Sequence, residues 1–163
     1  MRAAIVTIST SVAAGSREDL SGRALADHAR AVGADVIAQE VVPDDRAAIE
    51  ELLRRLVEPA ARISLICTTG GTGLTPDDVT PEATRAVIGR EVPGIAEAMR
   101  AESRKYTPMG MLSREVAGAA GETLIVNFPG SPKAIEQLFG VLAPVLEHAV
   151  ALLAREHGSA ARH

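Results

Sequence analysis

The chain has 163 residues, enough for a single domain with a substantial hydrophobic core. Its formal net charge of -4 and its 2% of aromatic residues exclude the basic, base-stacking surface of an extended nucleic-acid binder. The single cysteine, Cys67, cannot form an internal disulfide, which favours a reducing, cytoplasmic location.

Four strands are predicted from runs rich in Val, Ile and other apolar residues. The first covers residues 3–9 and is apolar almost throughout, as expected for a strand buried on both faces of a parallel sheet. The others are predicted at residues 35–42, 63–68 and 123–128, and a short additional strand could precede the last one near Val116.

Helices are predicted between and after the strands. Residues 46–57 give the clearest helical period, with Ile49, Leu52, Leu53, Leu56 and Val57 on one face. Further helices are predicted from Asp19 or Ser21 to Val32, from Thr80 onward, at residues 94–105 and at residues 133–156, where Pro144 either kinks or restarts the helix. Residues 106–110 are expected to be irregular. No membrane span is expected, because Pro144, Glu147 and His148 interrupt the most apolar stretch.

Together these elements predict one domain over residues 1–156, followed by a polar tail at 157–163 that frays. The alternation of strands and helices predicts an α/β fold, a three-layer sandwich with a mostly parallel central sheet. In such folds, ligands bind where the loops after the strands gather at one edge of the sheet. Four loops should therefore build one site, at residues 10–16, 43–45, 70–78 and 129–132.

The most informative of these loops follows the third strand. Residues 68–82 read TTGGTGLTPDDVTPE. Glycine lets the backbone approach a ligand and present N–H groups to oxyanions, so a phosphate cradle is predicted at Gly70, Gly71, Thr72 and Gly73. The segment matches neither a P-loop nor a dinucleotide fingerprint. A simple tight turn is the alternative, but a turn does not require the hydroxyls and acids that surround it.

Two acids at the same edge are candidate Mg²⁺ ligands. Asp44 follows the second predicted strand and Asp78 follows the third. Carboxylates from separate loops suit a cation that neutralises phosphate charge. Asp44 could equally be a helix N-cap, because it comes directly before a predicted helix. Asp77 is interpreted as a solvated neighbour, and the histidine spacings predict no zinc site.

Two further segments carry groups suited to an anion. Gly130, Ser131 and Lys133 combine close backbone approach, a hydroxyl and a cation at a helix start, although a capped helix with an exposed lysine would look the same. Ser113 and Arg114 pair a hydroxyl with a guanidinium and could contact an anionic ligand.

In their order and spacing these motifs closely resemble the signature of the molybdopterin adenylyltransferases. These are molybdenum-cofactor biosynthesis proteins related to a domain of gephyrin and of the plant cofactor enzymes. The matching segments are VPD at 42–44, TTGGTG at 68–73, DVTPEAT at 78–84, PG at 93–94, LSR at 112–114 and NFPGSPK at 127–133. The resemblance covers nearly the whole chain.

The resemblance implies a molybdopterin-binding fold, and an assembly that is a homotrimer or, as in some relatives, a hexamer. It implies Mg²⁺-dependent adenylylation of molybdopterin by ATP, giving adenylyl-molybdopterin and pyrophosphate, with Asp44 and Asp78 as the catalytic and metal-binding residues. A downstream metal-insertion protein is an implied partner, whereas nucleic acid and membrane are not. The implied nucleotide and pterin contacts are Gly70, Gly71, Thr72, Gly73, Thr80, Glu82, Ser113, Arg114, Asn127, Pro129, Gly130, Ser131, Pro132 and Lys133.

The sequence also departs from the family pattern. Asp77 stands where members often have Arg, which adds negative charge where a phosphate should bind, and the first loop lacks an Asp that often follows its serine. Two alternatives therefore stay open. One is a non-catalytic, oligomeric pterin-binding paralogue, and the other is a nucleotide-cleaving enzyme akin to the competence-damage-inducible proteins, whose loop resembles TPDD at 75–78.

Overall fold

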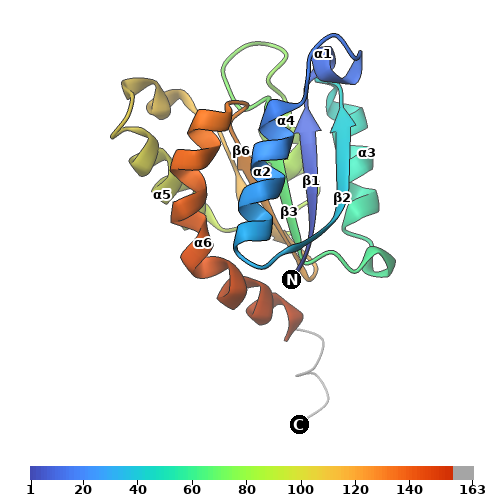
Figure 1. Ribbon diagram of the computed structural model, residues 1–163. Helices are drawn as coiled ribbons and strands as arrows, with labels where there is room; N and C mark the ends of the chain where they lie inside the picture. Colours follow the sequence, from blue (N-terminus) through green and yellow to red (C-terminus); the bar gives the residue numbers. More distant parts are fainter. Residues whose placement is uncertain (156–163) are drawn as a thin grey trace.

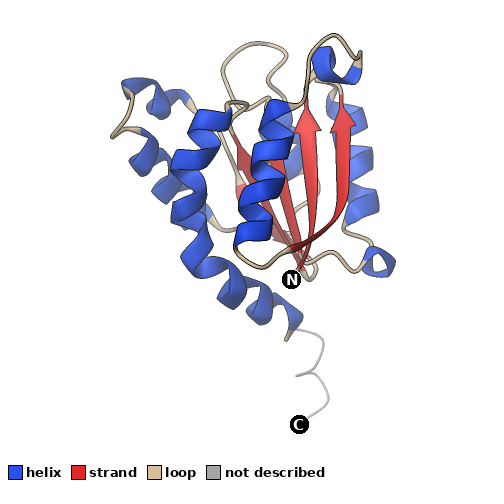
Figure 2. Cartoon of the chain, viewed as in Figure 1, coloured by secondary structure: helices blue, strands red, loops and turns tan. Residues whose placement is uncertain are grey.

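The computed structural model of the protein describes residues 1–155 as a central sheet covered by helices on both faces (Figures 1 and 2). The six strands are β1 (Arg2–Ile8), β2 (Asp35–Val42), β3 (Leu65–Thr69), β4 (Arg90–Glu91), β5 (Ala117–Ala120) and β6 (Thr123–Phe128), in the order β2-β1-β3-β6-β5-β4. The pairs among β2, β1, β3 and β6 are parallel, whereas β5 runs antiparallel to both neighbours. The predicted α/β sandwich with a mostly parallel sheet is confirmed.

The helices divide the core into two layers, one on each face of the sheet. They are α1 (Thr10–Ala13), α2 (Leu20–Ala31), α3 (Arg46–Leu56), α4 (Thr80–Arg85), α5 (Pro93–Ser103) and α6 (Pro132–Ala154), with 3-10 turns η1 (Pro59–Ala61) and η2 (Pro108–Leu112). Buried side chains of α2, α5 and α6 form one apolar cluster, and those of α3 and α4 form the other. Alternate residues of β1 enter each cluster, which explains its apolar sequence.

The structure differs from the predicted elements where segments are short. Residues 10–16, predicted as a loop, begin with α1, whose N-cap is Ser9. β4 has only two residues, too few to produce a periodic pattern. The strand predicted near Val116 is β5, one residue later, and the segment predicted as irregular runs into the 3-10 turn η2.

The last helix, α6, is continuous over 23 residues and passes through Pro144 without restarting. Its length and composition alone would allow it to cross a membrane, and only 22% of its most apolar window is buried. However, Ile135, Leu138 and Phe139 pack against the sheet, so the first half of α6 is a core helix of this domain. The predicted end of this helix at Glu156, and the tail at 157–163, lie outside the described residues.

Candidate functional site

The glycine loop after β3 has a backbone that only glycine adopts easily. Gly70 and Gly71 have φ angles of 98° and 66°. A Cβ on Gly70 would lie 2.3 Å from the carbonyl oxygen of Ile8, and one on Gly71 would lie 2.3 Å from Oγ1 of Thr80. The Thr80 hydroxyl donates to the Gly70 carbonyl over 2.9 Å. Thr80 was predicted to contact a ligand, but its side chain is buried and its hydrogen bond holds the backbone of the loop in place.

Asp44 is held by the segment that follows β1. Its Oδ2 accepts hydrogen bonds from the backbone N–H and the hydroxyl of Thr10, each over 2.8 Å. The N-cap of α3 is the neighbouring Asp45, which accepts from the N–H of Ala48 over 2.8 Å. The alternative interpretation of Asp44 as a helix cap is therefore wrong. Within residues 1–155 no hydrogen bond reaches Oδ1 of Asp44, so this oxygen is open to a cation.

Asp78 closes the glycine loop on itself. Its Oδ2 accepts from the N–H of Thr75 over 2.8 Å and from the Thr75 hydroxyl over 2.7 Å. Burial alone would raise the pKa of Asp78, but hydrogen bonds from Thr75 and Gly73 and the charge of Arg114 outweigh it and leave that pKa below its usual value. Asp78 is therefore ionised at neutral pH. Asp77 is exposed, as predicted for a solvated neighbour.

Asp44 follows the end of β2, and Asp78 follows the glycine loop after β3. Because β1 separates β2 from β3, the ends of those two strands are about 10 Å apart at two strand spacings, and the glycine loop extends from the second of them. Among the described residues, no group of three or more acidic, histidine or cysteine side chains could hold a metal alone. One or two carboxylates completed by substrate phosphates are a common Mg²⁺ site, so Asp44 and Asp78 fit this ion.

Arg114 is the brace of the glycine loop. Its backbone N–H donates to Thr72 over 2.9 Å, and its guanidinium donates to the carbonyls of Gly73 over 2.7 Å and Asp78 over 2.6 Å. The same guanidinium forms an ion pair with Glu82 at the start of α4. Burial alone would raise the pKa of Glu82, but this pairing leaves it below its usual value. Arg114 and Glu82 were both predicted to contact ligand, and here they bind each other.

The turn after β6 lies directly beside the glycine loop. The Thr69 hydroxyl donates to the Pro129 carbonyl over 2.9 Å, and Gly70 N–H donates to Phe128 over 3.1 Å. Ser131 caps α6 by accepting from Ala134 N–H. The predicted Gly130, Ser131, Pro132 and Lys133 are all exposed at this edge, and Pro129 is partly buried.

Asn127, also predicted to contact ligand, is fully buried in the structure. Its amide N–H groups donate to the hydroxyls of Thr68 over 2.9 Å and Thr84 over 3.0 Å, and its Oδ1 accepts from Val116 N–H over 3.1 Å. Both amide hydrogens are therefore used inside the protein, where they join β6 to β3 and α4, and Oδ1 joins β6 to the residue before β5.

A hollow of about 320 Å³ lies between the glycine loop and η2. Among residues 1–155, its lining has two hydroxyl side chains, Thr72 and Ser113, and is otherwise glycine and apolar residues: Gly73, Leu74, Met109, Leu112 and Pro129. Pro129 was predicted from the sequence, whereas Leu74, Met109 and Leu112 were not predicted as site residues. The signal available was Met109 in the segment predicted as irregular, because methionine adapts to varied ligand shapes.

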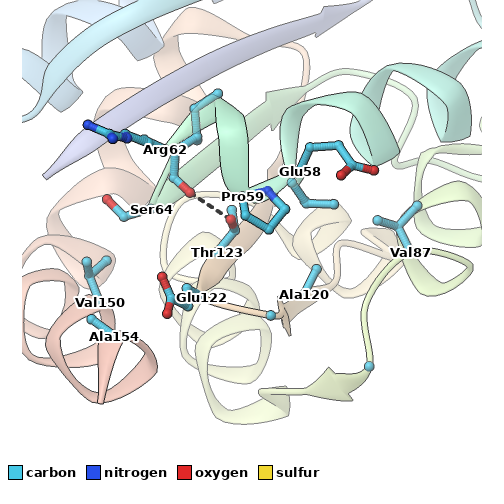
Figure 3. A pocket seen from close by; sticks show the side chains of 14 residues that line it. Glu58, Pro59, Arg62, Ser64, Val87, Ala120, Glu122, Thr123, Val150 and Ala154 are labelled. Carbon is cyan, nitrogen blue, oxygen red and sulfur yellow. Dashed lines mark hydrogen bonds between the residues drawn. The ribbon is translucent and has the colours of Figure 1, made fainter. Parts of the chain in front are cut away.

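A larger hollow, about 770 Å³, lies at the opposite edge of the sheet. Figure 3 shows Val150 and Ala154 of α6 on one side, and Glu58, Pro59 and Val87 on the other. The Thr123 hydroxyl, on its wall, donates to the Ile63 carbonyl over 2.7 Å. This hollow contains none of the predicted site residues, so the smaller hollow beside the glycine loop is the one relevant to them.

The fold and the site can be compared with known proteins. The family described as a probable molybdopterin binding domain matches residues 4–148. The chain belongs to this family. The Helicobacter pylori J99 molybdopterin adenylyltransferase is 36% identical over 151 residues, covering 91% of this chain and 85% of that protein. The chain spans only 19% of the Drosophila melanogaster molybdenum cofactor synthesis protein cinnamon, to which it is 43% identical over 113 residues that cover 69% of the chain.

Solved structures agree with this assignment. The molybdopterin biosynthesis enzyme MoaB of Thermus thermophilus has a TM-score of 0.87 and 44% identity, covering 95% of this chain and 97% of that one. The molybdopterin biosynthesis Mog protein of Mycobacterium ulcerans has a TM-score of 0.86 and 40% identity, covering 93% and 97%. The fold expected from the resemblance is thereby confirmed.

Proposed function

We propose that this protein acts in molybdenum cofactor biosynthesis as a molybdopterin adenylyltransferase. It would transfer an adenylyl group from Mg-ATP to molybdopterin, giving adenylyl-molybdopterin and pyrophosphate. What supports the proposal is a pair of carboxylates on the loops that follow the parallel strands β2 and β3, with Asp44 held by Thr10 and Asp78 held by Thr75. Relatives named molybdopterin adenylyltransferase, 36% identical over 91% of the chain, support it.

The residues of the site suit such a transfer mainly by alignment and electrostatics. A phosphate of molybdopterin would attack the α-phosphorus of ATP, and the bond to pyrophosphate would break. Backbone N–H groups of the glycine loop and the capped start of α6 would face the phosphates, with Lys133 in the first turn of that helix. Mg²⁺, held by Asp44 and Asp78, would supply the charge that offsets the phosphates during transfer.

Substitution of the two aspartates tests this function. Asp44→Asn and Asp78→Asn should each reduce pyrophosphate release from Mg-ATP and molybdopterin by at least about a hundredfold, if they hold the metal at the reacting phosphates. Circular dichroism and thermal unfolding should show an intact fold. Glu51→Gln, at an exposed position on α3 away from these loops, is the control for loss of an acidic side chain. Near-normal turnover in both test variants would refute the assigned roles.

The same assay separates the alternatives. Molybdopterin binding without turnover in the wild-type protein would favour a non-catalytic paralogue. ATP consumption without pterin would favour nucleotide cleavage. For the second alternative, the CinA structure of Thermoplasma acidophilum is only 19% identical at a TM-score of 0.64, so the likeness is one of fold alone.

We further propose a homotrimer in the cytoplasm. Exposed apolar side chains along the second half of α6, Val145 and Leu152 among them, favour burial against another copy. The unpaired, buried Cys67 suits a reducing compartment. Sedimentation equilibrium tests the assembly, and a monomer or dimer at micromolar concentration would contradict it.

A further inference from the structure

Glu115, just before β5, is a buried carboxyl group that the proposed mechanism does not use. Only 3% of the residue is exposed. Its Oε2 accepts a hydrogen bond from the Ser113 hydroxyl, and its buried Oε1 has no hydrogen-bond partner among residues 1–155. A buried carboxyl with an unused oxygen destabilises a fold, so its position calls for a functional reason.

The partner of Glu115 belongs to the candidate site. Ser113 lines the apolar hollow beside the glycine loop, where Thr72 is the other hydroxyl residue within the described part of the chain. A serine hydroxyl has one hydrogen to donate and lone pairs that accept. When that hydrogen points to an ionised Glu115, Ser113 can offer only lone pairs to a ligand. Such a group binds a ligand N–H and cannot donate to a phosphate oxygen.

We propose that Glu115 is a specificity-determining positioning residue, which fixes the Ser113 hydroxyl as an acceptor for an N–H donor of the pterin ring of molybdopterin. This inference rests on the proposed function, and it assigns the hollow to the pterin part of molybdopterin. The apolar walls formed by Leu74, Met109 and Leu112 suit the faces of a flat heterocycle. Ser113 is thereby assigned to the pterin rather than to an anionic group.

The charge of Glu115 is set by its surroundings. Burial raises its pKa, while the Ser113 hydrogen bond and the charge of Arg100 on α5 act in the opposite direction and offset only part of that rise. Arg100 also donates to the backbone carbonyl of Glu115 over 3.1 Å. From the β6 side, the nearby polar group is the neutral amide of Asn127, bonded to Val116. Protonation of Glu115 would add a hydrogen that the carboxyl can donate to Ser113, and this would free the Ser113 hydrogen and reverse its preference.

Kinetics with molybdopterin and Mg-ATP test this. Glu115→Leu removes the acceptor, and should raise KM for molybdopterin about three- to tenfold, the worth of one hydrogen bond, while KM for ATP and kcat stay within about twofold. Glu115→Gln keeps an acceptor oxygen and should restore most of the affinity. In a Ser113→Ala background, Glu115→Leu should cause no further rise, because the two residues act as one unit. Glu51→Gln, exposed on α3, is the control for loss of an acidic side chain.

The pH profile gives a second readout, which does not depend on the leucine variant folding. In the wild-type protein, KM for molybdopterin should rise as pH falls through the pKa of Glu115, and Glu115→Gln should lack this step. Superimposable profiles, or equal effects on both substrates, would overturn the inference and leave the proposed function intact. Wild-type protein that neither binds nor adenylylates molybdopterin would refute the proposed function, and this inference with it.

Discussion

Replacement of Arg114 by alanine would remove the brace of the glycine loop. Two hydrogen bonds to the carbonyls of Gly73 and Asp78 are lost, each worth about 1 kcal/mol net. The ion pair with Glu82 adds at most about 1 kcal/mol, because both side chains are about one-third exposed, at 33% and 37%. The free energy of unfolding should therefore fall by about 2–3 kcal/mol. At about 2–4 °C per kcal/mol for a domain of this size, Tm should drop by about 5–10 °C.

The loop itself should become easier to open. Leu74 is 64% exposed in the middle of the loop, so we expect thermolysin to cleave there when the loop opens. Arg114→Ala should be cut there faster than wild type under conditions where the rest of the domain stays folded. Arg114→Lys, which keeps the charge but loses the planar fork, should recover only part of the stability. Arg17→Ala, at an exposed position, is the control. A Tm within about 1 °C of wild type and unchanged cleavage would refute the bracing role.

Four other outcomes are expected. Gly71→Ala should lower stability by about 1–2 kcal/mol in urea unfolding, because a Cβ would both strain φ at 66° and collide with Thr80. Burial raises the pKa of Cys67 to about 12, so its thiol should resist alkylation at pH 8 unless the protein is unfolded first. The folded-state pKa of Asp78 is depressed, so the ionised side chain stabilises the fold above the ordinary Asp pKa. This contribution is lost as pH falls through the folded-state pKa. In Asp78→Asn, the free energy of unfolding should therefore depend less on pH in that range. Finally, Asp77→Arg should lower KM for ATP if nucleotide phosphates bind this loop, and an unchanged or higher KM would contradict that placement.

Much of the fold could be predicted because many residues within each long element favour the same secondary structure. The apolar run of β1 and the helical period of α3 each specify one element by many residues. Since β1, β2, β3 and β6 are parallel, their following loops had to meet at one edge, and the bond from Thr69 to Pro129 joins two of those loops.

The contacts inside the site could not be predicted in the same way. The guanidinium of Arg114 meets Gly73 and Asp78 only because β5 runs antiparallel and returns its first residues to the carboxyl edge of the sheet. No local pattern encodes that return, since β5 reads AGAA. Nor could the sequence tell whether Asp44 or Asp45 caps α3, because the choice depends on backbone angles at adjacent, chemically identical residues.

The strand order also has a consequence for how the protein is made. Among residues 1–155, β6 is the last strand, yet it lies between β3 and β5. The turn after β6 completes the candidate site, so about 130 residues must leave the ribosome before a ligand can bind at this edge of the sheet. Pairing of β3 with β6 also joins segments nearly 60 positions apart in the sequence. Formation of this contact should therefore make folding slower than in a helical bundle, where most contacts are local. Completion of the sheet therefore has to precede ligand binding during synthesis of the chain.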